Sequence, residues 1–404
     1  MLATISCREP DHVPCCFMLY KALQEQCADQ REFIERQLAL GLDAVVHLPV
    51  RVMRQPWPRP EQGDLRGLPV RFGPKVEVRD WRQDSADTEP ALHRQYVTPS
   101  GNLYTCVTLT EDYVHNDRIA IFDDYVIPRA RKRLVRCEED FAPLRHLLAA
   151  PTNNDIAEFR DAARSAKALA AKRGLLVAGE QGVLFDAACW LCGIEELMFK
   201  FMEAPEFVEE LFDIIGAWNR RRMEIVLDEG IDLFIKRAWY ETADFLSPDA
   251  YRRFILPIVK SEVRLAHEAG AKFACITTSS YTPFLDLYLD SEMDVLIGLD
   301  PVQDARADFA YTKRNLAGRM CLWGGVNGCV TVEMGTEEEV RNAVRDAMRV
   351  LAPGGGFILS PIDNVRVDTD RARANVRALI DEGRSFNVEA ASLPLRAMQP
   401  MPRR

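Results

Sequence analysis

The chain has 404 residues, of which 48% are hydrophobic and 28% are charged, and its net charge at pH 7 is −10. This composition is typical of a globular protein, and no basic face dominates, which argues against a nucleic-acid or membrane-surface binder. No apolar run approaches the ~18 residues that a membrane helix needs, and the N-terminus has no charged-then-apolar signal. We therefore expect a cytoplasmic protein. Its 11 cysteines, an odd number, predict reduced thiols.

The chain begins with a strand–helix–strand pattern. Residues 12–18 predict a buried strand, residues 22–40 an amphipathic helix, and residues 42–48 a second strand. Together they predict one β-α-β unit.

The pattern changes between about residues 52 and 130. Pro- and Gly-rich punctuation is followed by alternating segments and by the turn sequence Thr-Pro-Ser-Gly-Asn at 98–102, which predicts antiparallel hairpins. We expect an N-terminal β-rich insertion, which would either cover the functional mouth of the fold or form a homodimer contact.

Strand–helix alternation then continues to the end of the chain. The eight predicted strands are VPCCFM, DAVVHL, LLVAGE, LFIKRA, KFACIT, DVLIGL, MCLWGG and GFILSP. Near-continuous apolar runs of this kind are typical of buried parallel strands. Eight of them favour an α/β fold with a single closed (β/α)8 barrel of the TIM type over an open doubly wound sheet. We predict that barrel over residues 1–386 and a loosely packed C-terminal tail over residues 387–404.

Polar and aromatic residues stand at or just after the ends of the predicted strands. In a β/α barrel these ends converge on one mouth, where substrates bind. The residues expected there are His47, Arg51, Glu180, Trp239, Tyr240, Glu241, Thr278, Asp300, Trp323, Asn327, Ser360 and Asp363.

Within this set, the carboxylates give the most specific indication of function. Converging carboxylates would bind a divalent cation, orient a cationic substrate or act as general acid and base. Alternatively, they pair with Arg51, Lys236 or Arg237 and hold the mouth together. Trp239, Tyr240 and Trp323 predict an aromatic wall for a flat or methylated substrate, or simply a closed barrel top.

Three segments carry a family resemblance. WLCGIEEL at 190–197, followed by EAPEFV at 203–208, resembles a helix pair of the uroporphyrinogen decarboxylase superfamily. LSPDAYRRFILP at 246–257 is similar to that superfamily's S-P-x-x-y-r-x-f segment, and WGGVN at 323–327 with GGGFILSP at 354–361 fits its C-terminal end. The resemblance covers residues 135–385 and implies a single β/α barrel.

The resemblance implies two chemistries: cofactor-independent decarboxylation, and zinc-dependent methyl transfer that involves corrinoid proteins or coenzyme M. The decarboxylase's N-terminal arginine signature is not reproduced, since Met53-Arg54-Gln55 continues as Pro-Trp-Pro. The His-x-Cys zinc ligands of the methyltransferases are replaced by Ile276 and Thr278. A zinc site would therefore need Asp363, His47 or a glutamate as a substitute ligand.

We accordingly expect a methyltransferase that acts on a small methylated metabolite, with a corrinoid protein as acceptor. Glu241 or Asp363 would donate the proton, Asp300 would support it, and Thr278 and Asn327 would position the substrate. The remaining strand-end residues would line the substrate site. The alternatives are a decarboxylase that binds a carboxylate through Arg51, Arg54 or Lys236, and a non-catalytic ligand-binding barrel.

Overall fold

A computed structural model describes residues 1–49, 68–84, 89–115, 117–180, 182–277, 279–304 and 306–386. A seven-stranded parallel sheet forms the centre of the molecule, and its strands follow one another in chain order. The strands are β1 (Val45–Leu48), β6 (Leu176–Glu180), β7 (Leu233–Arg237), β8 (Lys272–Ile276), β9 (Val295–Leu299), β10 (Cys321–Asn327) and β11 (Phe357–Ile362).

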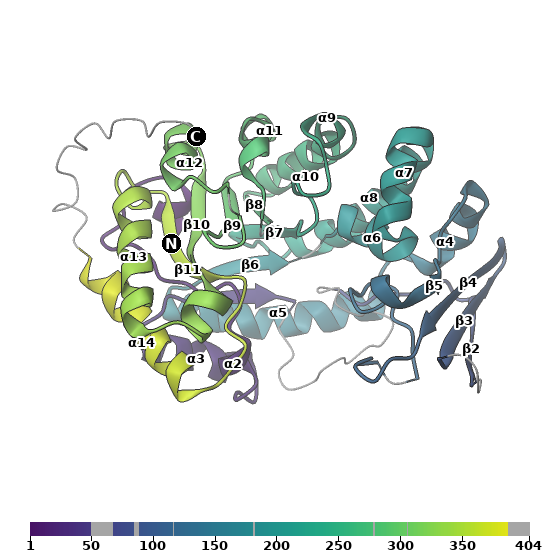
Figure 1. Ribbon diagram of the computed structural model, residues 1–404, viewed down its shortest axis with the longest axis horizontal. Coiled ribbons are helices and arrows are strands. Elements are labelled where there is room, and N and C mark those ends of the chain that lie inside the picture. The colour runs from purple at the N-terminus through teal and green to yellow at the C-terminus, as the bar shows by residue number, and fades with distance from the viewer. Residues whose placement is uncertain are drawn as a thin grey trace.

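Helices surround the curled sheet, as Figure 1 shows. The longer ones are α3 (Gln30–Leu40), α5 (Asn153–Arg173), α6 (Phe185–Cys192), α7 (Ile194–Glu203), α8 (Pro205–Leu227), α10 (Leu256–Glu268), α12 (Phe309–Leu316), α13 (Glu337–Leu351) and α14 (Asp370–Ser385). Shorter ones are α1 (Leu2–Ile5), α2 (Lys21–Gln24), α4 (Phe141–Leu147), α9 (Pro248–Ala250), α11 (Leu285–Asp290), η1 (Ile127–Arg129), η2 (Glu138–Asp140), η3 (Tyr251–Ile255), η4 (Thr282–Phe284) and η5 (Gly328–Glu333). Among the helices that the structure describes, none combines the length and apolar composition needed to cross a membrane.

The apolar core has two layers because successive side chains of a strand point to opposite faces. One cluster lies inside the curl of the sheet and includes Val45, Leu176, Ile235, Ile297 and Trp323. The larger cluster combines the other residues of the strands with the inner faces of the helices. Near-continuous apolar strands therefore reflect burial on both faces, as parallel sheets require.

The expected eighth strand is absent as a regular strand, so an eight-stranded barrel is not observed in the described residues. The segment around Cys15 lies beside β11, where Cys16 N–H donates to Leu359 O at 3.0 Å and Leu359 N–H donates to Pro14 O at 2.8 Å. It makes only an isolated parallel bridge. Pro14 has no N–H to donate, and Cys15 N–H is bound by the side chain of Asp43. These local bonds replace the ladder that a strand would form.

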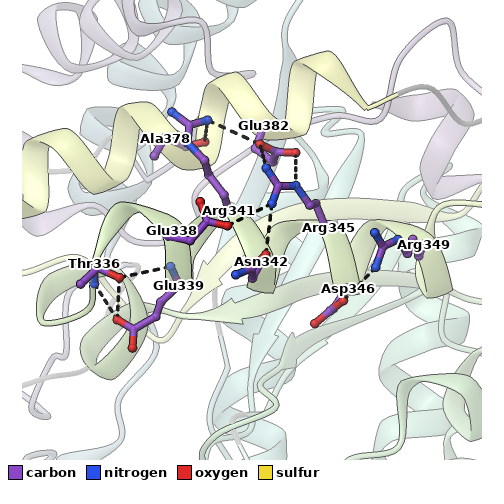
Figure 2. Close-up of polar contacts among 10 residues, drawn as sticks. All are labelled: Thr336, Glu338, Glu339, Arg341, Asn342, Arg345, Asp346, Arg349, Ala378 and Glu382. Atoms are coloured by element: carbon purple, nitrogen blue, oxygen red, sulfur yellow. Dashed lines mark hydrogen bonds and ion pairs between the residues drawn. The ribbon is translucent and has the colours of Figure 1, made fainter.

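The last two long helices are held together by charged side chains (Figure 2). Glu382 of α14 accepts hydrogen bonds from Arg345 of α13, from Nε at 2.8 Å and from Nη2 at 3.2 Å. At the start of α13, Thr336 and Glu339 form a reciprocal capping box. These contacts fix α14 beside α13 on the outside of the sheet.

The predicted antiparallel segment is confirmed as a four-stranded sheet in the order β2-β3-β4-β5. Its strands are β2 (Glu77–Gln83), β3 (Ala91–Thr98), β4 (Gly101–Thr108) and β5 (Ala130–Lys132). Pro99 and Ser100 form the turn between β3 and β4, where Thr98 Oγ1 donates to Gly101 O at 2.7 Å. The sheet lies at one end of the molecule, beside α4, α6 and α7 (Figure 1). Residues 52–67 of the predicted insertion and the predicted tail at 387–404 lie outside the described residues.

One glycine permits the close approach of two central strands. Gly298 of β9 has φ +124°, and a Cβ there would lie 1.3 Å from the carbonyl oxygen of Thr277, which follows β8. Gly298→Ala should lower the free energy of unfolding by more than about 3 kcal/mol, because both the strained φ and the clash oppose the native state. Urea denaturation measures the change.

Gly216→Ala is the matched control. Gly216 lies within α8, and no atom stands within 4 Å of the added Cβ, so this variant should gain about 0.5–1 kcal/mol. Equal stability of the two variants would contradict the assigned packing of β8 and β9.

Candidate functional site

A pocket of about 410 Å³ lies at the C-terminal ends of the parallel strands. Its polar lining residues are Glu180, Arg237, Trp239 and Asp363. Its apolar lining consists of Met18, Leu19, Ile276, Ile297, Gly298 and Ile362. The strand ends therefore converge as the sequence predicts, although the pocket gathers only part of the expected set.

Strand alternation decides which polar residues reach the interior. Leu233 and Ile235 of β7 belong to the cluster inside the sheet, so Arg237, two residues further on, points to the same side. Lys236 points to the opposite side, toward the helices. By the same reasoning, Glu180 follows the inward-facing Ala178 of β6.

Arg237 is a buried cation held between aromatic rings. Its guanidinium carbon lies 3.7 Å from the ring centroid of Trp239 and 5.1 Å from that of Trp190. Its Nε lies 3.9 Å from Asp186 Oδ1. These contacts fix the plane of the guanidinium and offer the pocket a group suited to bind a carboxylate in two-point contact.

Asp186 is the buried counter-charge behind Arg237. It belongs to α6, and its Oδ2 accepts from Tyr240 N–H at 3.4 Å. Burial raises the pKa of Asp186 to about 7, while the nearby Arg237 opposes that rise and Glu241 adds to it. The charge behind Arg237 therefore changes near neutral pH.

His47 and Glu180 form a second polar group at the pocket. His47 Nδ1 lies 3.7 Å from Glu180 Oε2, and both side chains are about 90% buried. His47 lines a neighbouring pocket of about 240 Å³, which shares Met18 with the main one. Glu180 lines the main pocket and His47 lines the neighbouring one. A proton shared by these two side chains would therefore lie between the two pockets.

Glu241, the expected proton donor, lies behind the wall of the sheet instead of in the pocket. Its carboxylate is only 1% exposed and lies 3.4 Å from Lys236 Nζ, which also pairs with Glu262 of α10 at 3.2 Å. Burial raises the pKa of Glu241, and Lys236 opposes the rise. The geometry supports a structural ion cluster, because the outward direction of Lys236 draws Glu241 toward the helices.

Asp300 and Asn327 bind each other instead of lining the pocket. Asp300 accepts from Asn327 Nδ2 at 2.7 Å and from the backbone N–H groups of Val302 and Gln303. Asn327 Oδ1 accepts from Val330 N–H at 2.6 Å. Burial raises the pKa of Asp300, and the backbone donors oppose that rise. These bonds join the ends of β9 and β10 and leave the expected substrate contacts unsupported.

The remaining expected residues have distinct positions. Asp363 lines the pocket and forms an ion pair with Arg366 at 2.5 Å. Trp323 is fully buried and donates to Cys16 O at 2.8 Å. Ser360 Oγ accepts from Met18 N–H at 3.3 Å. Trp323 and Ser360 therefore attach the N-terminal segment to the sheet.

Tyr240 connects the mouth to the antiparallel insertion. Tyr240 Oη and Trp190 Nε1 both donate to Asp124 Oδ1, each at 2.7 Å. Asp124 stands between β4 and β5 of the insertion. The insertion thus supports the ring of Trp190, against which Arg237 lies.

Two expected site residues, Arg51 and Thr278, lie outside the described residues. Among the residues that the structure does describe, no three His, Cys, Asp or Glu side chains are grouped so as to hold a metal ion. The described side chains therefore do not fit a zinc centre.

Sequence reasoning missed Asp124, Asp186 and Trp190 as parts of the site and treated Arg237 only as an ion-pair partner. The alternation of LFIKR over 233–237 was a usable signal for Arg237, because its apolar residues already define two faces. No comparable local signal marks the other three, since each stands on a helix or loop far from β7 in the sequence.

Lys236→Met should lower the free energy of unfolding by about 3–5 kcal/mol near neutral pH, because two buried carboxylates would lose their cation. The loss should shrink as pH falls, because burial raises the pKa of Glu241 and protonation then neutralises it. Urea denaturation across a pH series measures both effects. Lys260→Met, which removes an exposed ion pair with Asp290 from α10, should cost no more than about 1 kcal/mol. Equal losses would refute the buried cluster.

Asp186→Asn should alter the pH dependence of stability. The folded pKa of Asp186 is raised to about 7, so the folded state binds the proton more tightly than the unfolded chain does. Relative to the variant, the native protein should lose stability on the order of 1 kcal/mol per pH unit as pH rises from about 4 to about 7. Denaturation midpoints compared with those of Asp161→Asn, an exposed carboxylate, test this. Parallel pH curves would count against the buried acid.

The solved methyltransferase from Methanosarcina mazei aligns with a TM-score of 0.55 and 16% identity, over 95% of this chain and 96% of its own. At that identity the similarity concerns the fold. The B12-independent methionine synthase from Shewanella sp. W3-18-1 gives a TM-score of 0.40 at 11% identity, over 55% of this chain and 64% of its own. A TM-score below 0.5 does not establish a shared fold.

No curated protein matches the sequence significantly. The family model described as uroporphyrinogen decarboxylase (URO-D) matches residues 120–386. That span runs from the last part of the insertion through β11 and α14. The chain belongs to the uroporphyrinogen decarboxylase family.

Proposed function

We propose that this protein is a methyltransferase that takes a methyl group from a small methylated metabolite carrying a carboxylate. The observation that carries the proposal is the buried guanidinium of Arg237 in one pocket with two carboxylates, Glu180 and Asp363. Family membership and the overall fold of the Methanosarcina mazei methyltransferase support the reaction class.

The charge of the pocket lining supports a small substrate. Arg237 is its one cation among the lining residues that the structure describes. A tetrapyrrole with many acidic arms would need several cations, so the lining favours a substrate with a single carboxylate.

Trp239 adds a second group for that carboxylate. Its Nε1 is buried and has no hydrogen-bond acceptor among the described residues. A buried donor of this kind is costly unless a partner satisfies it. A substrate carboxylate beside Arg237 would supply the acceptor, while Ile276, Ile297 and Ile362 provide apolar surface for a methyl group.

Methyl transfer from a neutral ether oxygen or amine nitrogen requires a proton for the leaving atom. The bond between the methyl carbon and that atom breaks as the acceptor takes the carbon, and the leaving atom then gains the proton. In this proposal Glu180 donates the proton, in place of Glu241. His47 then supplies a new proton to Glu180. A corrinoid protein is the proposed acceptor, and it would approach the strand ends where the pocket lies.

Decarboxylation is the second candidate, favoured by the same pairing of Arg237 with carboxylates. Arg237 would bind one substrate carboxylate, and Asp363 or Glu180 would stabilise positive charge on the substrate as carbon dioxide departs. The two candidates differ in their products: one yields a methylated acceptor, the other yields carbon dioxide.

The test is to incubate the protein with a panel of O- and N-methylated carboxylic acids and reduced cobalamin, the corrinoid cofactor alone. Methylcobalamin formation would be followed by its visible spectrum, and carbon dioxide release would be measured in parallel. Methylcobalamin with no carbon dioxide is the expected result. Carbon dioxide release without methyl transfer would replace the proposal with decarboxylation, and binding without turnover would leave a ligand-binding protein.

Arg237→Met should reduce kcat/KM on the order of a hundredfold, because two charge-assisted hydrogen bonds to the substrate carboxylate would be lost. Arg253→Met is the matched control, since Arg253 is exposed and pairs with Glu209 on the surface. Thermal unfolding of both variants separates a folding defect from lost binding. Unchanged kcat/KM in folded Arg237→Met would refute the assigned role.

A further inference from the structure

The first strand of the insertion presents an open edge. In the described sheet, β2 hydrogen-bonds only to β3, and all seven of its residues, Glu77–Gln83, are exposed. Figure 1 shows it at the end of the molecule that is remote from the parallel sheet. A long exposed edge offers a row of backbone donors and acceptors to another strand.

We propose that β2 pairs with β2 of a second copy of this chain, in antiparallel fashion, and so forms one continuous sheet across a two-fold axis. Antiparallel pairing places the two copies of the same strand in reverse order, which suits a symmetric dimer. The charge pattern of β2 indicates that its partner strand is β2 of a second copy.

Geometry limits the registers that symmetry allows. Directly opposite residues of an antiparallel pair project from the same face. A two-fold axis perpendicular to the sheet keeps every residue on its own face, and neighbouring residues alternate between faces. A residue can therefore oppose only itself or a residue an even number of positions away, so each register is centred on one residue.

The charge pattern selects among those registers. Centring on Arg79, Asp80 or Arg82 places that charge opposite its own copy, and like charges directly opposite each other are destabilising. Centring on Trp81 instead places Asp80 opposite the second copy's Arg82, twice by symmetry. Centring on Val78 also avoids like charges, but it pairs only three residues of the strand.

The register centred on Trp81 also extends an existing aromatic stack. Trp81 is 43% exposed, and its ring lies 5.0 Å from that of His93 at an interplanar angle of 5°. Tyr104 stacks on the same group, with its ring 5.8 Å from that of Trp81. In the dimer, the second copy's Trp81 would stand directly opposite and cover the exposed ring.

The carboxylate of Asp80 is already held in place by Arg94 of the same chain. Arg94 donates to both of its oxygens, at 2.6 and 2.7 Å, which fixes the carboxylate at the strand. Arg82 currently pairs with Asp84 on the surface, and such exposed pairs contribute little. Exchanging that pair for one with the fixed Asp80 costs little and gains register specificity.

The first measurement is the molar mass by sedimentation equilibrium over a range of protein concentrations. The native protein should form a dimer. Arg82→Glu should raise the dissociation constant of the dimer at least about tenfold. The introduced carboxylate would lie opposite Asp80 of the other copy, at both symmetry-related positions. Arg79→Glu is the matched control: in this register Arg79 faces the neutral Gln83 of the second copy, so the dissociation constant should change less than about threefold.

Cross-linking then tests the register directly. In a Cys137→Ser background, which removes the exposed native thiol, Trp81→Cys should form a disulfide-linked dimer on mild oxidation. Val78→Cys, on the same strand, should not, because it faces Asp84 of the second copy. Three results would overturn the proposal: a monomer at every concentration, an unchanged dissociation constant in Arg82→Glu, or efficient cross-linking through Val78→Cys.

Discussion

The two-residue period of the parallel strands is the constraint on which the site depends. Because both faces of the sheet are buried, each strand residue either enters the interior or packs against a helix. Adjacent cations on β7 illustrate the result: Arg237 lines the pocket, while Lys236 joins Glu241 and Glu262 behind the wall. A shift of one residue would exchange these two functions, so the position of β7 within the sheet determines the chemistry of the pocket.

The two buried cations of β7 are stabilised in different ways. Lys236 lies between two carboxylates, and their attraction outweighs the burial that would otherwise lower its pKa. Arg237 lies 3.9 Å from the carboxylate of Asp186 and against the faces of two tryptophans. A guanidinium is weakly hydrated and stacks on aromatic rings, which makes this arrangement tolerable for arginine and unsuitable for lysine.

The insertion contributes to the site through its core-facing side. Asp124 accepts from both Trp190 and Tyr240, and Phe122 stacks on Trp218 of α8 at 5.5 Å. These contacts attach the antiparallel sheet to the wall that holds Arg237. The opposite end of the sheet carries the open edge of β2. One segment thus supports the pocket at one end and, in our proposal, a second copy of the chain at the other.

The sequence by itself determined the local structure: seven of the eight expected strands, the antiparallel hairpins and the strand-end positions of Glu180 and Asp363, because these follow from short-range periodicity and turn chemistry. It did not reveal that Pro14 and Asp43 would keep the first segment from forming a strand, since that depends on which groups take its N–H bonds. Nor did it separate Arg237 from Lys236 or predict the partnership of Arg237 with Asp186. Only the tertiary structure decided these points, because the curl of the sheet sets which face is interior and packing brings distant charges together.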